Sequence, residues 1–415
     1  MVSWAVTALV VEPEEVAAIA AAIARSALVA FDLEFLAQER LVPALCLVQV
    51  AWTPGEHEGL DAAAPAGGAP EVALVDPLAV DVRPIVDAIA AHPCAVAHGA
   101  RQDLQLLATR FGASVRGIAD TQVMAAFAGL GDQVGLAALA GELAGATIGK
   151  ELQWTDWAQR PLAPAQLAYA AADVRHLPEI YGRLVARLGA RVAWARAESA
   201  GVAAEAEAAA RVTPETAWRQ LGAVRGLEPA AFAAAVALAA WRQRTAIELD
   251  RPLGQVLSDR ALIELARRRP GTVEAVRKAA GLSPVARQRA PAIAAAIAEP
   301  PPAGAPLPAW RPPTPRAQRW SDALVSIAQL VAERIGVAPR LLATRADAEE
   351  LARAVDERGL AAAEALPALA TWRRGVLGEL WLGWLTGALA LIADLAAPSG
   401  LGLIPRDRSG PPDPA

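Results

Sequence analysis

A proline-rich segment, EPPPAGAPLPAWRPPTP at 299–315, most constrains how this chain of 415 residues can fold. Proline fixes φ and lacks a backbone N–H, so the segment cannot lie inside a helix or a central strand, and we expect a semi-extended linker. On a prior of roughly 100–200 residues per domain, a chain of this length should hold two to four folding units. The linker therefore predicts at least one unit on each side of it.

Before the linker, strand-like and helix-like patterns alternate. A helical pattern at 101–111 follows the fourth of four apolar runs of strand length, and strands that alternate with helices predict an α/β layer. The strand-like runs are 27–32, 44–52, 71–76 and 94–98. A Gly, Pro and Ala-rich stretch at 53–70 is expected to be a surface loop. The pattern from Pro164 to Leu188 is helical, with a kink expected at Pro178.

After an alanine-rich connector at about 197–212, the pattern is helical throughout, with helix starts indicated by Ser258, Thr272 and Ser283. The fold class is therefore an α/β domain followed by two small all-α units. The predicted boundaries are 1–212 for the α/β domain, 213–298 for the first helical unit, 299–315 for the linker, 316–396 for the second helical unit and 397–415 for a disordered tail.

Charge is unevenly distributed. The formal net charge is −5, but residues 1–212 hold 14 basic and 24 acidic side chains, whereas 213–300 hold 13 basic and 8 acidic ones. The first helical unit is therefore the plausible phosphate-facing surface. The two cysteines, Cys46 and Cys94, exclude a disulfide framework and a four-thiolate zinc site, which fits the cytoplasm. We expect no membrane span, because the longest uncharged apolar stretch is shorter than the ~20 residues required.

Two acids end the first strand-like run. In FDLEF, Asp32 and Glu34 stand two residues apart, so both side chains should leave the same face of a strand. Buried like charges are costly, and a divalent metal is the usual way to neutralise them. An isolated D-x-E can equally pair with basic side chains.

Three later residues have similar ambiguity. Asp103 lies on the polar side of the 101–111 helix, where it could also be an ordinary exposed acid. Tyr169 and Asp173 are spaced i, i+4 and share a helical face, although the tyrosine could simply pack against a neighbouring helix. Together, the order and spacing of the five residues indicate a two-metal site for phosphodiester hydrolysis. Oxygen ligands select Mg²⁺, with Mn²⁺ as the other option.

The chain resembles bacterial ribonuclease D, in the tyrosine subclass of the DEDD 3′→5′ exonucleases. FDLEF resembles the first exonuclease motif of that family, AHGARQDLQLL the second and YAAADVRHLPEIY the third. GKELQWTDWAQRPL resembles the segment that leads into the third motif, and the resemblance covers most of 1–190. It implies a ribonuclease H-like domain with a mixed sheet flanked by helices.

The resemblance also assigns residues. It implies that Asp32, Glu34, Asp103 and Asp173 ligate two divalent cations and that Tyr169 positions the attacking water. Four further residues match family positions and are expected to be scaffolding around the groove: Asp120, Lys150, Trp157 and Arg160. Leu33 departs from the small or hydroxylated residue common between the first two acids of the family, which affects the expected contact with the terminal nucleotide.

The segment from about 213 to 295 resembles the helicase-and-RNase-D C-terminal (HRDC) domain, and 316–396 resembles the second such domain of the family. Trp372, Trp381 and Trp384 are expected to be core. Candidate phosphate contacts, each of which could also lie on an ordinary solvated helix face, are Arg242, Arg244, Arg251, Arg267, Arg268 and Arg269.

The expected function is that of a 3′→5′ exoribonuclease that releases 5′-mononucleotides. By resemblance, its partners include tRNA precursors with 3′ extensions, and it is expected to act as a monomer. A DNA 3′→5′ exonuclease of the proofreading or repair type uses the same acids and is the nearest alternative. A catalytically silent RNA-binding scaffold is the other, and it would require the loss of one of the acids.

Overall fold

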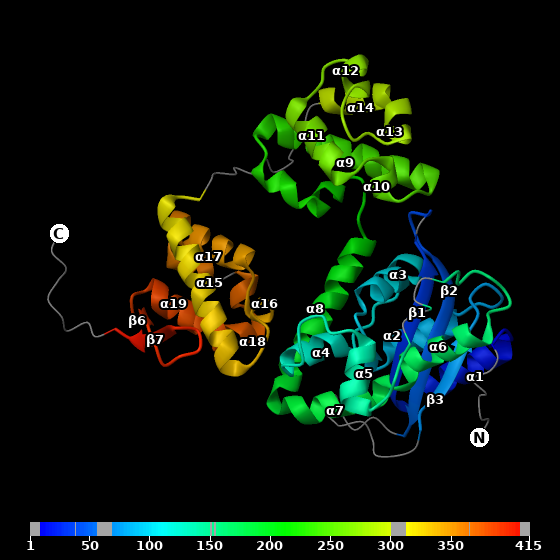
Figure 1. The fold of residues 1–415 in the computed structure, drawn as a ribbon. Coiled ribbons are helices and arrows are strands. Elements are labelled where there is room, and N and C mark those ends of the chain that lie inside the picture. Colours follow the sequence, from blue (N-terminus) through cyan, green and yellow to red (C-terminus); the bar gives the residue numbers. More distant parts are fainter. Residues whose placement is uncertain are drawn as a thin grey trace, which may run out of the picture.

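The computed structural model describes residues 9–37, 39–55, 69–149, 152, 155–299, 313–364 and 366–406. Lys150 and most of the expected loop at 53–70 and of the expected linker at 299–315 lie outside the described residues. Figure 1 shows three parts, which we call the sheet domain (9–212), the first helical unit (213–299) and the second helical unit (313–406).

The sheet domain contains a mixed five-stranded sheet in the order β3-β2-β1-β4-β5. The central strand β1 pairs antiparallel with β2 and parallel with β4. The strands are β1 (Ser26–Leu36), β2 (Ala44–Pro54), β3 (Glu71–Val75), β4 (Ala95–Ala97) and β5 (Ile118–Asp120). The four predicted strands are confirmed, and β5 was not predicted.

Helices cover both faces of the sheet because apolar side chains alternate along β1. Leu28 and Ala30 belong to one hydrophobic cluster, while Val29, Phe31 and Leu33 belong to another. The helices of the sheet domain are α1 (Pro13–Ile23), α2 (Arg83–Ala91), α3 (Arg101–Phe111), α4 (Thr121–Phe127), α5 (Leu136–Ala144), α6 (Pro164–Arg175), α7 (Leu177–Leu188), the 3₁₀ turn η1 (Gly189–Arg191) and α8 (Val192–Ala210).

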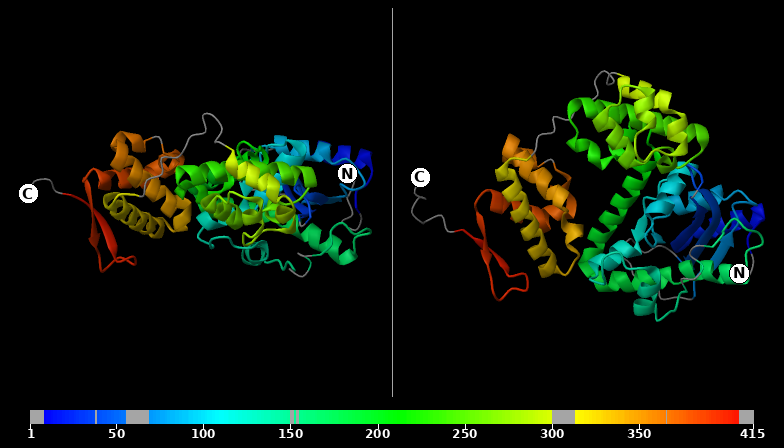
Figure 2. Two further views of the ribbon diagram at one scale, coloured as in Figure 1. Left: turned by 90° about the horizontal axis from the view of Figure 1, so that it is seen from above. Right: turned by 45° about the horizontal axis from the view of Figure 1, so that its top comes forward.

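Two connections differ in detail from the sequence pattern. The helical pattern from Pro164 to Leu188 divides at His176 into α6 and α7, which confirms the expected kink because Pro178 lies in the first turn of α7. The expected connector at 197–212 is helical over its first fourteen residues, which belong to α8. This helix buries Ala195, Ser199 and Ala203 and runs toward the first helical unit (Figures 1 and 2).

The first helical unit has its own hydrophobic cluster. Ser258, Thr272 and Ser283 accept hydrogen bonds from backbone N–H groups at the starts of three helices, which confirms the predicted caps. Its elements are η2 (Ala217–Gln220), η3 (Gly222–Gly226), α9 (Pro229–Leu249), α10 (Leu253–Val256), α11 (Asp259–Arg268), α12 (Val273–Arg277), α13 (Pro284–Gln288) and α14 (Ala290–Ala298).

The second helical unit was predicted to be all-α, and it is helical except for a two-stranded hairpin at its C-terminal end. Residues 401–405 form a strand that pairs antiparallel with 389–393, so a disordered tail from 397 is wrong over the described part of that segment. Leu401 and Leu403 pack against the hydrophobic cluster, which explains why this Gly and Pro-containing stretch can be a strand. The elements are α15 (Pro315–Ile335), α16 (Pro339–Leu342), α17 (Arg345–Arg358), η4 (Leu360–Ala363), η5 (Pro367–Leu369), α18 (Thr371–Arg373), the π-helical turn η6 (Arg374–Gly378), α19 (Glu379–Leu385), β6 (Leu389–Ala393) and β7 (Leu401–Pro405).

The two helical units begin alike. In each, a helix of 21 residues is followed by a single turn of 4 residues and then by a longer helix capped by a hydroxyl side chain, Ser258 in one and Thr344 in the other. This shared order agrees with the expectation that both have an HRDC-like architecture.

The second helical unit packs directly on the sheet domain. One hydrophobic cluster contains buried side chains from both, including Phe127, Leu324 and Trp381. At the junction, Trp372 stacks on Trp194 with ring centroids 5.1 Å apart. The expectation that Trp381 is core is confirmed, since it is fully buried and its Nε1 donates to the carbonyl of Leu324 at 2.9 Å.

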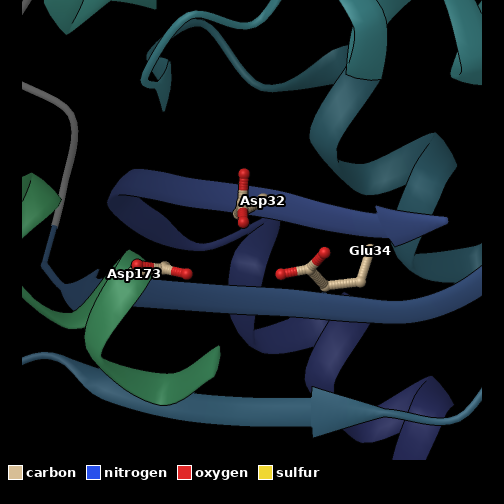
Figure 3. A group of neighbouring side chains, drawn as sticks. All are labelled: Asp32, Glu34 and Asp173. Atoms are coloured by element: carbon tan, nitrogen blue, oxygen red, sulfur yellow. The ribbon is translucent and has the colours of Figure 1, made fainter. Parts of the chain in front are cut away.

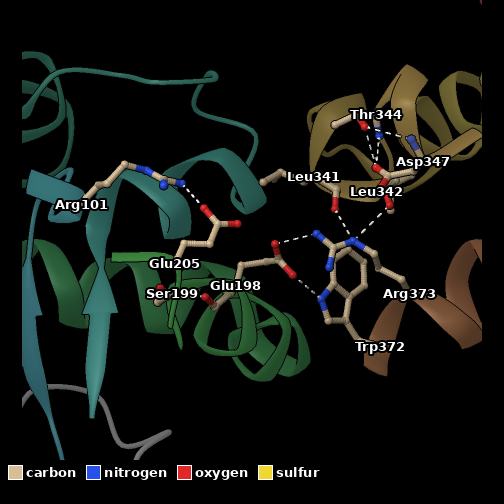
Figure 4. A network of polar contacts seen from close by, with 11 residues as sticks. Arg101, Glu198, Ser199, Glu205, Leu341, Leu342, Thr344, Asp347, Trp372 and Arg373 are labelled. Carbon is tan, nitrogen blue, oxygen red and sulfur yellow. Dashed lines mark hydrogen bonds and ion pairs between the residues drawn. The ribbon is translucent and has the colours of Figure 1, made fainter. Parts of the chain in front are cut away.

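Charged groups reinforce this junction. The Glu198 carboxylate on α8 accepts hydrogen bonds from Trp372 Nε1 at 3.1 Å and from Arg373 Nη2 at 2.6 Å, as Figure 4 shows. Among the described residues, no helix has the length and apolar character needed to cross a membrane.

Candidate active site

Three carboxylates converge beside the central strand. Alternation along β1 points Asp32 and Glu34 away from Phe31 and Leu33, toward the face covered by α6, and α6 supplies Asp173. Oxygen atoms of the three side chains all lie within 4.8 Å of one another (Figure 3). The expectation that Asp32 and Glu34 leave one face of a strand is confirmed.

The fourth acid comes from a neighbouring helix. Asp103 lies in the first turn of α3 and is buried, and its pKa is raised by burial and then by the negative charges of Asp32 and Glu34. The alternative of an ordinary exposed helix acid is therefore wrong. α3 begins just after β4, which runs parallel to β1, and this places Asp103 at the same end of the sheet as the other acids.

The buried position of the three acids makes their ionisation unfavourable. Burial raises the pKa of Asp32 to about 7, and it raises the pKa of Glu34 to about 9 with further contributions from Asp32 and Asp173. The pKa of Asp173 rises to about 8, first because of burial and then because of Asp32. Carboxylates so arranged at neutral pH either hold protons or bind cations.

Tyr169 stands beside this cluster, one helical turn before Asp173. Its hydroxyl donates a hydrogen bond to the Asp173 carboxylate, which lowers the pKa of that acid. Burial and the surrounding carboxylates raise the pKa of the phenol well above its usual range. Its ring lies 6.1 Å from that of the buried Trp157. Tyr169 is therefore a protonated hydroxyl held at the edge of the cluster.

All five residues line one cleft of about 800 Å³. Phe35, Leu36 and Leu136 provide apolar walls, and Gln102 and Gln122 add amide groups. An open cleft with an acidic floor and mixed walls can admit the end of a polymer and bind cations beneath it.

Two of the expected scaffolding residues, Asp120 and Arg160, support this cleft through hydrogen bonds. Asp120 accepts hydrogen bonds from the N–H groups of Gly99 and Ala100, each at 2.9 Å, and so fixes the turn between β4 and α3. Arg160 forms a bidentate pair with Asp76 at 2.6 and 2.7 Å and donates to the carbonyl of Cys46. The structure thus agrees with scaffolding roles for Asp120 and Arg160.

Gln49 was missed by the sequence reasoning. It is fully buried on β2, and its Nε2 makes a long hydrogen bond of 3.4 Å to Asp32 Oδ2. The available signal was a single amide in the middle of the apolar run LCLVQVA, where an unpaired polar group would be costly. His98 also lines the cleft, but its Nδ1 is hydrogen bonded to the Thr121 hydroxyl at 2.9 Å.

The candidate RNA-contacting arginines divide into two groups. Arg242 was predicted wrongly: it is buried, and its Nη1 donates to the Leu257 carbonyl and to Asp259. The guanidinium therefore joins α9 to α11 and cannot reach a phosphate. The candidates that remain exposed are Arg244, Arg251, Arg267, Arg268 and Arg269.

Fold and site together define a class of protein, a 3′→5′ exonuclease with carboxylates on a mixed sheet. Residues 8–189 match the 3′-5′ exonuclease family, and residues 231–297 match the HRDC domain family.

The relatives narrow the class. A ribonuclease D of Acidiphilium cryptum is 36% identical over 93% of this chain and 94% of its own length, and one of Jannaschia is 35% identical over 92% and 95%. The crystal structure of Escherichia coli RNase D, described as an exoribonuclease involved in structured RNA processing, superposes with a TM-score of 0.75 at 26% identity, covering 92% of this chain and 98% of that one. The chain belongs to the ribonuclease D family. Its activity is that of a hydrolytic 3′→5′ exoribonuclease, and it depends on divalent metal.

Proposed function

We propose that Asp32, Glu34, Asp103 and Asp173 hold the divalent cations with which this enzyme hydrolyses the 3′-terminal phosphodiester of RNA, and that Tyr169 positions the attacking water. The observation that supports this most strongly is the convergence of the acids, three of them within 4.8 Å of one another, on the floor of one cleft.

The donor set fits two hard cations, with Mg²⁺ as the proposed metal. The carboxylates offer oxygen ligands, and oxygen ligands favour Mg²⁺ or Mn²⁺ over softer metals. Cations of this kind, when bound, supply charge stabilisation at the attacking and leaving oxygens of the phosphodiester. The raised pKa values of Glu34 and Asp173 indicate how much the protein gains when the negative charges are neutralised.

We assign to Tyr169 the orientation of the attacking water. Because its pKa lies well above the usual range, the phenol keeps its proton and acts through hydrogen bonding. Its bond to Asp173 fixes the direction of the hydroxyl, which can orient a water toward the terminal phosphate. The walls formed by Phe35 and Leu36 would contact the terminal nucleoside.

We further propose that the substrates are tRNA precursors with 3′ extensions and that the working unit is the monomer. One chain supplies all five site residues, so no second subunit is needed to complete the site. Both cysteines are buried free thiols, which supports the expectation of a reducing cytoplasm.

A digestion assay tests this function. The protein should release 5′-mononucleotides one at a time from tRNA precursors with 3′ tails of graded length when Mg²⁺ is present, and it should act much more slowly on DNA strands of matched sequence. Equal rates on RNA and DNA would instead indicate the DNA exonuclease, and tight RNA binding without nucleotide release with either Mg²⁺ or Mn²⁺ would indicate the silent scaffold.

A further inference from the structure

The two helical units are attached to the sheet domain in different ways. The second unit shares a hydrophobic cluster with the sheet domain, whereas the first unit has a cluster of its own. Leu41, from the turn between β1 and β2, packs against this separate cluster, as does Val212 where the chain passes from α8 into the first unit. The described part of that turn, residues 39–43, therefore contacts both parts of the molecule.

The turn is anchored on both sides. Leu41 packs against the core of the first helical unit, while the next residue, Val42, packs against the core of the sheet domain. In Figure 1 the turn reaches from the end of the two long strands toward α9 and α10. Two adjacent residues thus connect two cores, which fixes the first unit relative to the end of β1.

Asp250 is the polar centre of the contact. It follows the last residue of α9 with φ +46°, and its Oδ1 accepts a hydrogen bond from the Leu41 N–H at 3.2 Å. Its Oδ2 lies 3.5 Å from Arg40 Nε in an ion pair whose side chains are 59% and 55% exposed. Surface pairs of this kind contribute little stability, so Arg40 keeps its charge accessible to another partner.

Two arginines, Arg40 and Arg251, therefore adjoin Asp250 near the end of the cleft. Phe35, Leu36 and Ala37 line the cleft, and Arg40 follows three residues later, within ~20 Å of Glu34 along even an extended chain. Arg251 directly follows Asp250 in the chain, is exposed, and forms no ion pair with the described part of the chain.

We propose that the β1–β2 turn seats the first helical unit beside the cleft, so that Arg40 and Arg251 bind the phosphate backbone of the RNA strand between the metal site and that unit. This inference rests on the proposed function and deepens it by defining the route of the substrate. The sheet domain supplies Arg40 and the first helical unit supplies Arg251. The phosphate-binding route therefore exists only while the two parts of the molecule are docked.

The role of the two arginines in RNA binding is tested with Arg40→Gln, Arg251→Gln and the double variant, and Arg25→Gln is the matched control. Arg25 is also exposed but precedes the opposite end of β1. RNA binding is measured with a chelator present, so that the RNA is not shortened. For a 12-nucleotide RNA, each substitution should reduce the slope of log K against log salt by about 0.7 and the affinity at 0.1 M salt by about fivefold.

The length of the RNA separates this effect from a folding defect. The loss should be much smaller for a dinucleotide, whose single internucleotide phosphate would lie at the metal site, whereas a damaged fold would weaken the binding of both RNAs. If the wild-type protein shortens RNA but the double variant has the same slope as Arg25→Gln, the inference is wrong and the proposed function stands. Failure of the wild-type protein to shorten RNA would defeat the proposed function itself.

The docking contact is tested separately at Asp250. Asp250→Asn keeps the acceptor for the Leu41 N–H, whereas Asp250→Ala combined with Leu41→Ala removes both the hydrogen bond and the apolar contact. Small-angle scattering should show a larger radius of gyration for the double variant only, together with weaker binding of the 12-nucleotide RNA. An unchanged radius and unchanged affinity in that variant would overturn the docking role.

Discussion

At the scale of single residues, the site is defined by charges that the fold brings together at a cost. Asp32, Glu34 and Asp173 have ordinary pKa values of 3.8 to 4.5 and are shifted upward to about 7, 9 and 8. A cation that binds them removes this cost, and metal binding and stability should therefore be linked.

This linkage has a definite sign. Between about pH 4 and 9 the folded, metal-free protein holds protons that the unfolded chain has lost, so its free energy of unfolding should fall as the pH rises through that range. Comparison with the variant Asp32→Asn and Glu34→Gln isolates the effect. Relative to that variant, the wild-type protein should lose at least about 2 kcal/mol between pH 5.5 and 8.5 in urea titrations with chelator.

Added Mg²⁺ should restore the stability of the wild-type protein, and more so at pH 8.5 than at pH 5.5. A difference between the two proteins that stays constant across this pH range would show that the carboxylates do not carry the shifted protons.

The meeting of the five residues in one cleft could be predicted from their order and spacing along the chain, although each pair alone is ambiguous. Arg242 could not be assigned in that way. Its neighbours Trp241 and Gln243 are buried as well, and only the packing of α9 against α11 shows that its charge points inward. Gln49 was missed because nothing local identifies its contact with Asp32 across two paired strands.

At the scale of elements, long periodic segments were predictable and short ones were not. β5 has three residues and gains its identity from pairing with β4, which no local pattern reports. The hairpin of β6 and β7 was missed because Gly, Pro and Ser near its turn resemble a disordered tail. The length of α8 is an exception: the alanine-rich sequence at 197–212 indicated a connector but not the 19-residue helix that packs on α3.

The ion pair between Arg160 and Asp76 should contribute strongly to the stability of the cleft wall. Arg160 joins the segment before α6 to β2 and to Asp76 after β3, whose side chain is only 5% exposed. Arg160→Met would leave this carboxylate buried without its cation, and we expect a loss of about 3 kcal/mol in urea denaturation.

The exposed pair Arg183 and Glu179 provides the control, since Arg183→Met should cost less than about 1 kcal/mol. Arg160→Lys should recover only part of the loss, because lysine cannot form the two parallel bonds of the guanidinium. A cost for Arg160→Met no larger than that of the control would show that the pair does not hold the segment in place.

At the scale of the whole molecule, the two helical units have different roles: the first carries positive charge, and the second packs on the sheet domain. Residues 1–212 carry an excess of acids, which repels RNA, and 213–300 carry an excess of basic residues. The shared core between the second helical unit and the sheet domain could not be predicted, since contacts such as that of Trp372 with Trp194 join residues far apart in sequence.

This division predicts how the first helical unit contributes. Replacing Arg267, Arg268 and Arg269 together by glutamine should weaken RNA binding and reduce the salt slope by about 2. The rate of hydrolysis at saturating RNA should change much less, because these residues lie outside the cleft. An equal change of three exposed arginines of the sheet domain, Arg110, Arg175 and Arg183, serves as the control. Equal losses in both variants would contradict the division.

The central claim is that the buried acids hold the metals that hydrolyse RNA. Its most direct test is the rate of 5′-mononucleotide release from a 3′-extended tRNA precursor with Mg²⁺ by the Asp32→Asn variant, beside Glu14→Gln, a change of an exposed acid on α1. We predict that Asp32→Asn reduces the rate at least about 10³-fold while its circular dichroism stays that of the wild-type protein, and that Glu14→Gln has full activity. A folded Asp32→Asn protein that releases nucleotides at the wild-type rate would contradict the account.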